Sequence, residues 1–179
     1  MMEIQTKRLQ LSPIIEEDTD ELHQLWIQSS VRKYLWDDLV IPIETTREII
    51  DRNQTALSQF LYGLWGVRPL EQKILIGFCG YWPFFEPPEV QLIYGLSDSY
   101  WGQGLATEMA KAAIEVGFKT FKFQQIAAST DEPNIRSIAV LERLGMFREK
   151  RQNIDGKETI FYKIEKEKFE NDRTNSLRI

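Results

Sequence analysis

The segment with the clearest chemical potential is residues 92–109, LIYGLSDSYWGQGLATEM. A strand-like run ends at Leu96, a short polar turn follows, and Gly102 and Gly104 come just before a run with helical spacing. Glycine lets the backbone approach a ligand closely, and a helix start presents unpaired N–H groups and partial positive charge. The spacing therefore fits a phosphate or pyrophosphate site, although two glycines alone serve a tight turn equally well.

Two common phosphate loops do not fit this turn. A Walker-type loop has four residues between its glycines and ends in Gly-Lys-Ser/Thr, whereas one residue separates Gly102 from Gly104. A dinucleotide fingerprint has a further glycine three residues later, where this chain has Thr107. Both readings are therefore excluded by spacing.

A second polar pair begins the run NIRSIAVLERLG. Asn134 is a good helix N-cap and Ser137 is tolerated in a first turn, so both have a purely structural explanation. Gly145 ends the same run as a C-terminal cap.

The elements that must position these residues follow from hydrophobic periodicity and turn signals. The pattern predicts the order β-α-α-β-β-β-α-β-α-β-β, with a parallel, right-handed strand-helix-strand unit over 90–130 in an otherwise antiparallel sheet. The predicted strands are 4–12, 60–67, 73–82, 89–96, 125–130, 146–154 and 157–165. The predicted helices are 16–29, 44–59, 104–121 and 134–144.

Composition limits the remaining possibilities. The chain has 179 residues, 42% of them hydrophobic, which suits one domain with a real core; we assign residues 1–165 to it and expect the charged tail 166–179 to fray. The net charge of −5 argues against a nucleic-acid partner. One histidine and one cysteine supply neither a usual metal site nor an internal disulfide. With no apolar run of membrane-span length and no signal peptide, we expect a cytoplasmic protein without a membrane partner, either monomer or homodimer.

The glycine turn resembles the acyl-coenzyme A loop of GCN5-related N-acetyltransferases (GNAT), Gln/Arg-x-x-Gly-x-Gly/Ala. Trp101 takes the Gln/Arg position, Gly104 the first glycine and Ala106 the last small residue. Trp101 departs from that pattern and is similar to the ribosomal-protein N-terminal acetyltransferase (RimJ/RimL-type) branch, whose turn commonly reads Tyr-Trp-Gly-x-Gly. Three further stretches resemble this branch in the right order, so that the resemblance spans residues 6–165: TKRLQLSPIIEEDTDEL, DEPNIRSIAVLERLGMF and GKETIFYKI.

This resemblance implies an α/β (α+β) fold in a single domain. Its mixed, mostly antiparallel twisted sheet of about seven strands has a central parallel pair splayed at the cofactor site and helices on both faces. It also implies transfer of an acetyl group from acetyl-CoA to a primary amine, either a protein N-terminal α-amine or a small-molecule amine. A non-catalytic acyl-CoA-binding sensor remains the alternative.

The resemblance further implies that backbone N–H groups of the turn hold the pyrophosphate, that the strand end pairs with the pantetheine, and that a backbone N–H stabilises the oxyanion. The implied cofactor-binding residues are Tyr94, Gly95, Leu96, Trp101, Gly102, Gln103, Gly104, Leu105, Ala106, Thr107, Asn134, Arg136 and Ser137.

The catalytic set implied by the resemblance is Ser137 with Asn134. Many relatives place a general-acid tyrosine seven residues after this asparagine, but here the position holds Leu141, so Ser137 becomes the acid candidate. The base stays open, because no spacing singles out one of the candidate carboxylates. These are Glu158, Glu89, Glu86 and Asp37.

The acceptor side is assigned from aromatic and acidic residues in two segments. Trp36 is followed by Asp37 and Asp38, and Phe84 and Phe85 lie in the Pro-rich run PFFEPPE. Acidic and aromatic side chains together suit a cationic amine, although ordinary solvated loops have the same composition.

Overall fold

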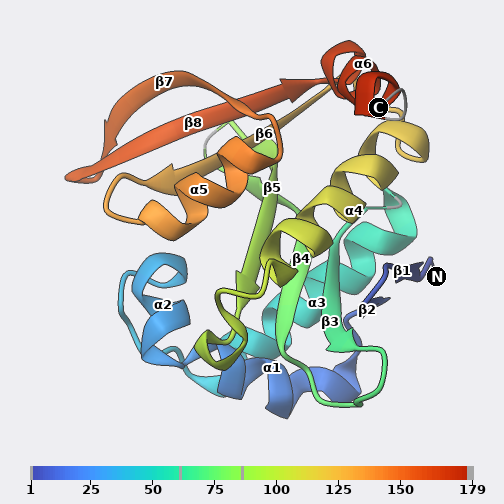
Figure 1. The fold of residues 1–179 in the computed structure, drawn as a ribbon. Helices are drawn as coiled ribbons and strands as arrows, with labels where there is room; N and C mark the ends of the chain where they lie inside the picture. The colour runs from blue at the N-terminus through green and yellow to red at the C-terminus, as the bar shows by residue number, and fades with distance from the viewer. Residues whose placement is uncertain (1, 61, 86, 177–179) are drawn as a thin grey trace.

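The computed structural model describes residues 2–60, 62–85 and 87–176, with side chains described up to Asn171 (Figure 1). Its strands are β1 (Ile4–Gln5), β2 (Leu9–Pro13), β3 (Leu64–Pro69), β4 (Gly77–Phe84), β5 (Glu89–Leu96), β6 (Gln125–Asp131), β7 (Phe147–Ile154) and β8 (Lys157–Glu165). Its α-helices are α1 (Thr19–Trp26), α2 (Ser29–Leu35), α3 (Ile43–Gln59), α4 (Leu105–Lys119), α5 (Ile135–Arg143) and α6 (Lys166–Ser176). Short 3₁₀ turns occupy Glu16–Asp18 and Asp98–Tyr100.

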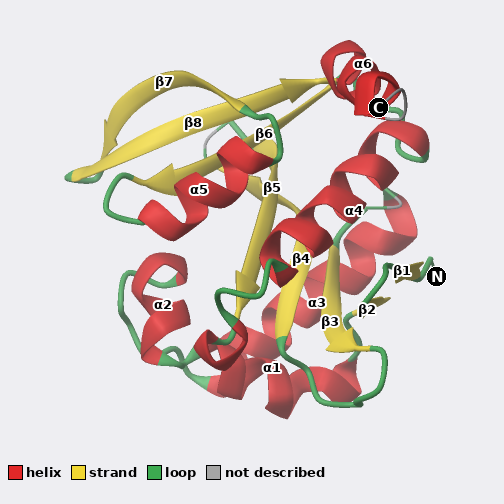
Figure 2. Ribbon diagram, viewed as in Figure 1, coloured by secondary structure: helices red, strands yellow, loops and turns green. Residues whose placement is uncertain are grey.

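The strands form one sheet in the order β1-β2-β3-β4-β5-β6-β8-β7. Only β5 and β6 pair in parallel; the other neighbouring pairs are antiparallel. Helices cover both faces, with α4 and α5 in front of the sheet and α1 and α3 behind it in the view of Figure 2. The predicted fold class and the parallel unit are confirmed.

Each face of the sheet has its own hydrophobic core. On the α4 side, Met109 and Ile114 are fully buried with the side chains of the central strands. On the other side, Leu22, Trp26 and Ile50 bring α1 and α3 against β3 and β4. These apolar residues recur at helical spacing, which is why the two helical layers dock as they do.

The parallel pair opens toward its carboxyl ends. Its register has a single partner pair, Gln91 opposite Ala127, near the start of both strands. Beyond it, β5 stays paired with β4 as far as Leu96, and β6 stays paired with β8 as far as Asp131. The opening therefore lies between two strands that are each held firmly on their other side, as the predicted splay requires.

The amino-terminal segment differs from prediction in two places. The expected strand 4–12 is two strands, because the Thr6 side chain bonds with Leu9 and closes a turn, so the sheet has eight strands rather than about seven. The expected helix 16–29 is a 3₁₀ turn followed by the shorter helix α1 (Thr19–Trp26), and the sequence did not predict α2, which begins at Ser29. Gln28 adopts an extended backbone (φ −57°, ψ 133°), which ends α1 and lets α2 start in a new direction.

The prediction that the tail frays is wrong for Lys166–Ser176, which form α6. Phe169 is buried, and its ring centroid lies 5.4 Å from that of Phe118 on α4. The Lys166 N–H also donates to the Gln124 carbonyl at 3.0 Å, and the Lys168 ammonium lies 5.2 Å from the centre of the Phe147 ring, so several contacts dock the start of this segment. Residues 177–179 lie outside the described part of the chain.

Candidate active site

The glycine turn lies between the end of β5 and the start of α4. Gly102 and Gly104 have φ of 75° and 74°, the left-handed region that favours glycine. A Cβ atom on Gly102 would meet nothing within 4 Å, and one on Gly104 would meet only Arg8 Nη2, at 3.7 Å. The backbone conformation rather than crowding therefore requires glycine, and the turn borders open space.

The start of α4 keeps its donors available. Gly104 is the N-cap residue, and among the described residues no side chain caps this helix. The first N–H groups of a helix have no intrahelical partner and carry partial positive charge. The Thr107 hydroxyl in the same turn is buried and has no described hydrogen-bond partner. The turn thus fits an anionic ligand that supplies acceptor oxygens.

Trp101 ties this turn to its neighbours. Its indole Nε1 donates to the Leu96 carbonyl at 2.8 Å, which fixes the turn against the end of β5. The Arg136 guanidinium of α5 lies 4.6 Å from the centre of the Trp101 ring, within cation–π range. Two residues predicted from sequence to face the cofactor, 35 positions apart, are therefore in contact.

A pair of hydroxyl groups connects β5 with α5. The Tyr94 hydroxyl lies 2.9 Å from Ser137 Oγ and 3.2 Å from the Ser137 carbonyl oxygen, to which it donates. Asn134 accepts a bond from the Ser137 N–H at 3.3 Å, so it is the predicted N-cap. Burial raises the pKa of Tyr94 despite its bond with Ser137, so the phenol stays protonated at neutral pH. Leu141 is a core residue.

The predicted acceptor residues form two separate aromatic clusters among the described rings. Trp36 packs edge-on against Trp26, with ring centroids 5.6 Å apart. Phe84 and Phe85 adjoin Phe161 of β8, which lies 5.5 Å from Phe85. The register of the sheet pairs Phe161 with Ser129 of β6, which borders the opening. The cluster of Phe84, Phe85 and Phe161 is therefore close to the opening.

A buried glutamine bridges the opening at its closed end. Ser129 Oγ on β6 donates to Gln91 Oε1 at 2.7 Å, and Gln91 Nε2 donates to Glu89 at 2.7 Å. This bond crosses from β6 to β5 just beyond their single paired position. It fixes the point at which the strands begin to separate.

Most of the carboxylates predicted as candidate bases already accept hydrogen bonds or form ion pairs. Glu158 accepts bonds from Asn153 and Arg151, and these hold its pKa below the usual range. Asp37 forms an ion pair with Lys157. Glu86 lies outside the described residues.

Asp131, which the sequence did not single out, has a different environment. It ends β6 at the open end of the parallel pair. Burial raises the pKa of this carboxyl, and the nearby negative charge of Asp37 adds to the effect; Lys157 and a bond with Thr159 oppose it. The sequence signal that could have identified Asp131 was its position at the end of a strand, three residues before the N-cap Asn134.

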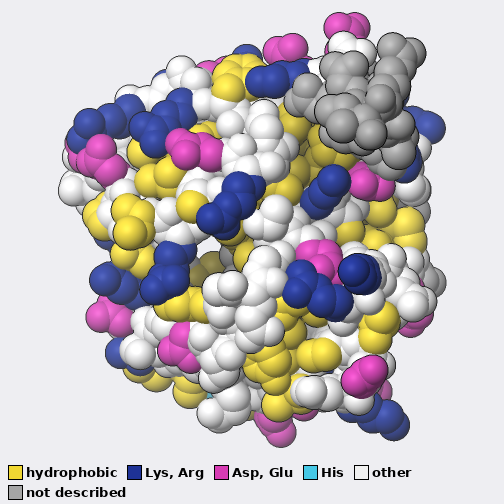
Figure 3. Space-filling model, in the orientation of Figure 1, with side chains coloured by type: hydrophobic (Ala, Val, Ile, Leu, Met, Phe, Trp, Pro, Cys, Tyr) yellow, Lys and Arg dark blue, Asp and Glu magenta, His cyan; other side chains and the backbone are white. Residues whose placement is uncertain are grey.

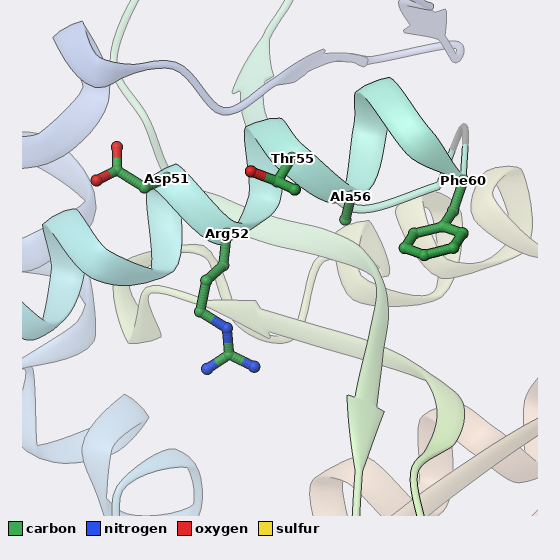
Figure 4. Close-up of a pocket in the computed structure, with 5 residues that line it drawn as sticks. All are labelled: Asp51, Arg52, Thr55, Ala56 and Phe60. Carbon is green, nitrogen blue, oxygen red and sulfur yellow. The ribbon is translucent and has the colours of Figure 1, made fainter.

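Two hollows are visible in the structure. Figure 3 shows one between the segments that Figure 1 labels α5 and α2, with Lys and Arg side chains on its rim. The other, of about 320 Å³, lies along α3 (Figure 4) and is lined by Asp51, Arg52, Thr55, Ala56 and Phe60. The second hollow is lined by no residue of the glycine turn or of α5.

The described residues contain no group of three or more His, Cys, Asp or Glu residues able to hold a metal ion. In the same part of the chain, no helix is both long and apolar enough to traverse a bilayer.

Comparison with known proteins identifies the family. The sequence model of the acetyltransferase (GNAT) domain matches residues 8–147. The chain belongs to the GNAT acetyltransferases. It is 27% identical to an uncharacterized N-acetyltransferase, p20, of Bacillus licheniformis over 150 residues, 83% of this chain and 84% of the relative. It is 26% identical to spermidine N(1)-acetyltransferase of Escherichia coli K12 over 139 residues, 76% and 72% of the two chains.

A solved structure supports the same fold. RimL, a ribosomal L7/L12 α-N-protein acetyltransferase in complex with coenzyme A, superposes with a TM-score of 0.78 over 92% of this chain and 98% of its own, at 18% identity. The protein is thus an acetyltransferase of a family that uses acetyl-CoA, as the resemblance in the sequence predicted.

Proposed function

We propose that this acetyltransferase transfers an acetyl group from acetyl-CoA to a primary amine, either a protein N-terminal α-amine or a small-molecule amine. The observation that carries the proposal is the opening between β5 and β6, bordered on one side by the glycine turn and on the other by the Tyr94–Ser137 pair. The family of the chain supports the donor, and the relatives support an amine acceptor.

The donor would bind along β5 and the glycine turn. Backbone N–H groups of Gln103, Gly104, Ala106 and Thr107 would hold the pyrophosphate, because a helix start offers unpaired donors to an anion. The edge of β5 at 94–96, unpaired with β6, would accept the pantetheine as an added strand. The thioester would then enter the opening between the two strands.

Acetyl transfer requires one bond to form and one to break. The neutral amine attacks the thioester carbonyl carbon to form the C–N bond, and the C–S bond breaks as the coenzyme leaves as thiolate. A backbone N–H of β5 stabilises the oxyanion. Ser137 donates the proton that the thiolate takes up and regains a proton from solvent water, and Tyr94 orients the serine hydroxyl through their hydrogen bond.

The amine must lose a proton before or during the attack. At pH 7, deprotonating an α-amine of pKa near 7.8 costs about 1 kcal/mol, and a lysine of pKa near 10.4 costs about 4.6 kcal/mol. We assign the base to Asp131, whose raised pKa and place at the open end of β6 suit this role. Trp36, Phe84 and Phe85 would contact the acceptor. The amine itself differs between relatives, since one acts on spermidine and a structural neighbour on a protein α-amine.

The test is thiol release from acetyl-CoA in the presence of peptide N-termini, lysine and polyamines, followed by mass spectrometry of the acceptor. A mass increase of one acetyl group on an amine, dependent on Ser137, supports the proposal. Tight coenzyme A binding without turnover across the panel would instead favour a sensor.

A further inference from the structure

The turn between β1 and β2 is fastened to the first turn of α4 through one carboxylate. Glu108 Oε1 accepts bonds from the Thr6 hydroxyl at 2.6 Å and from the Arg8 backbone N–H at 2.9 Å. Its other oxygen accepts a bond from Arg8 Nε at 2.7 Å and lies 2.6 Å from Arg8 Nη2. The Glu108 side chain is only 17% exposed, whereas Arg8 is 45% exposed, so the carboxylate is shielded from water and the guanidinium is only partly shielded.

The third nitrogen of Arg8 reaches the glycine turn itself. Arg8 Nη1 donates to the carbonyl oxygen of Gln103 at 2.9 Å. A trans peptide is planar, and its C=O and N–H point in opposite directions. Because the Gln103 carbonyl is turned toward Arg8, the N–H of Gly104 in the same peptide points away from Arg8, to the outer side of the turn.

This peptide would otherwise be easy to rotate. Gly102 and Gly104 flank Gln103, and glycine changes between backbone regions at little steric cost. A rotated Gln103–Gly104 peptide would present its carbonyl, the negative end of the dipole, to a bound phosphate. The guanidinium prevents that rotation by holding the carbonyl on the inner side.

We propose that Arg8, fixed by Glu108 and Thr6, is a positioning residue that presets the Gly104 N–H for the pyrophosphate of the acyl-CoA donor; this inference rests on the proposed function. Arg8 acts through orientation rather than as a phosphate-binding cation, since its charge is already matched by Glu108. The site it serves is assembled from segments about 100 residues apart in the chain.

The test compares two donors that differ in the pyrophosphate. S-Acetylpantetheine ends before it, whereas acetyl-CoA includes it. Arg8→Gln, Arg8→Lys and Glu108→Gln are each expected to raise the KM for acetyl-CoA and the calorimetric Kd for coenzyme A about tenfold, the worth of one charge-assisted hydrogen bond. The kcat/KM for S-acetylpantetheine should stay at the wild-type value. Arg47→Gln, which removes an exposed arginine paired with Glu44 on α3, is the matched control and should change neither.

Glu108→Gln separates orientation from charge. If Arg8 served as a direct cation, freeing it from Glu108 would tighten coenzyme A binding, and that result would overturn the proposal. Full activity in Arg8→Lys would also overturn the proposal. An equal loss of kcat/KM with both donors would overturn it too, because it indicates general damage to the protein. Every assay is run well below the lowest melting temperature of the variants, which melting curves provide. A wild type that neither binds coenzyme A nor releases thiol refutes the proposed function. Wild-type binding that the variants match refutes only the role of Arg8.

Discussion

Replacing Tyr94 with phenylalanine tests the hydroxyl pair at the opening of the sheet. The change removes one oxygen that lies 2.9 Å from Ser137 Oγ and 3.2 Å from the Ser137 carbonyl. The ring stays in place, because phenylalanine has the same shape without the hydroxyl. The variant therefore asks what the bond contributes rather than what the ring packing contributes.

The chain offers a matched control in Tyr81→Phe. The Tyr81 hydroxyl is buried and donates to the Ala113 carbonyl at 2.8 Å, beneath α4 and away from Ser137. Tyr81→Phe removes one hydrogen bond of about 1 kcal/mol, whereas Tyr94→Phe removes the two contacts of its hydroxyl with Ser137. In a domain of this size, loss of one such bond corresponds to a fall in Tm of about 2–4 °C. We expect Tyr94→Phe to lower Tm by between one and two times as much as Tyr81→Phe.

Only Tyr94→Phe should slow acetyl transfer. A general acid contributes about 10²- to 10⁴-fold, and loss of one bond that orients it should remove about tenfold in kcat. Burial raises the pKa of Tyr94, so the phenol is protonated throughout the pH range of the assay. The ratio of the wild-type kcat to the Tyr94→Phe kcat should therefore not change between pH 6 and 9. Steady-state kinetics at saturating acetyl-CoA and acceptor provide the measurement.

A double-mutant cycle with Ser137→Ala gives the decisive comparison. If Tyr94 acts through Ser137, adding Tyr94→Phe to Ser137→Ala should slow kcat no further. Additive losses, a wild-type kcat in Tyr94→Phe, or an equal loss of kcat in Tyr81→Phe would each show that Tyr94 does not act through Ser137.

Three other variants test separate parts of the structure. Asp131→Asn should lower kcat by about 10²-fold for a lysine or polyamine acceptor, measured by thiol release, because it removes the assigned base. The pKa of Asp131 is raised in the folded state, so its favourable contribution to stability is present below the unfolded pKa and is lost as pH rises through the folded pKa. Asp131→Asn should therefore raise Tm at pH 7 and leave Tm unchanged near pH 3. A lower Tm at pH 7 would contradict this expectation. Replacing Phe84 and Phe85 with alanine should raise the acceptor KM and leave the Kd for acetyl-CoA alone; an unchanged acceptor KM would exclude them from the acceptor site. Gly117→Ala should lower Tm by several degrees in thermal melts, because its Cβ would lie 2.3 Å from the Tyr81 hydroxyl, and an unaltered Tm would show that α4 can shift.

The part of the site that is contiguous in sequence was predictable. The strand expected at 89–96 is β5 at Glu89–Leu96, and the helix expected at 104–121 is α4 at Leu105–Lys119. Both depend on local signals, namely an apolar strand, a glycine turn and helical periodicity. The N-cap role of Asn134 was visible for the same reason.

What the sequence did not reveal depends on contacts between distant segments. The bonds from Arg8 to Glu108 and from Tyr94 to Ser137 join residues that no local periodicity relates. The tail was expected to fray because its composition is polar, yet burial of Phe169 against the core outweighs that preference. Local patterns fix which elements form, whereas tertiary packing decides which side chains meet.

The position of Leu141 shows how such contacts alter a functional argument. From sequence, the absent tyrosine at this position left Ser137 as the acid candidate without a visible partner. In the fold, Leu141 is a core residue, and a phenol approaches Ser137 from β5 instead of from α5. The hydroxyl pair therefore joins β5, which borders the opening, to α5, so any change in the separation of β5 from α5 also changes the orientation of the proposed acid. In the proposed mechanism, donor binding along β5 and proton transfer at Ser137 would therefore be coupled through the Tyr94–Ser137 hydrogen bond.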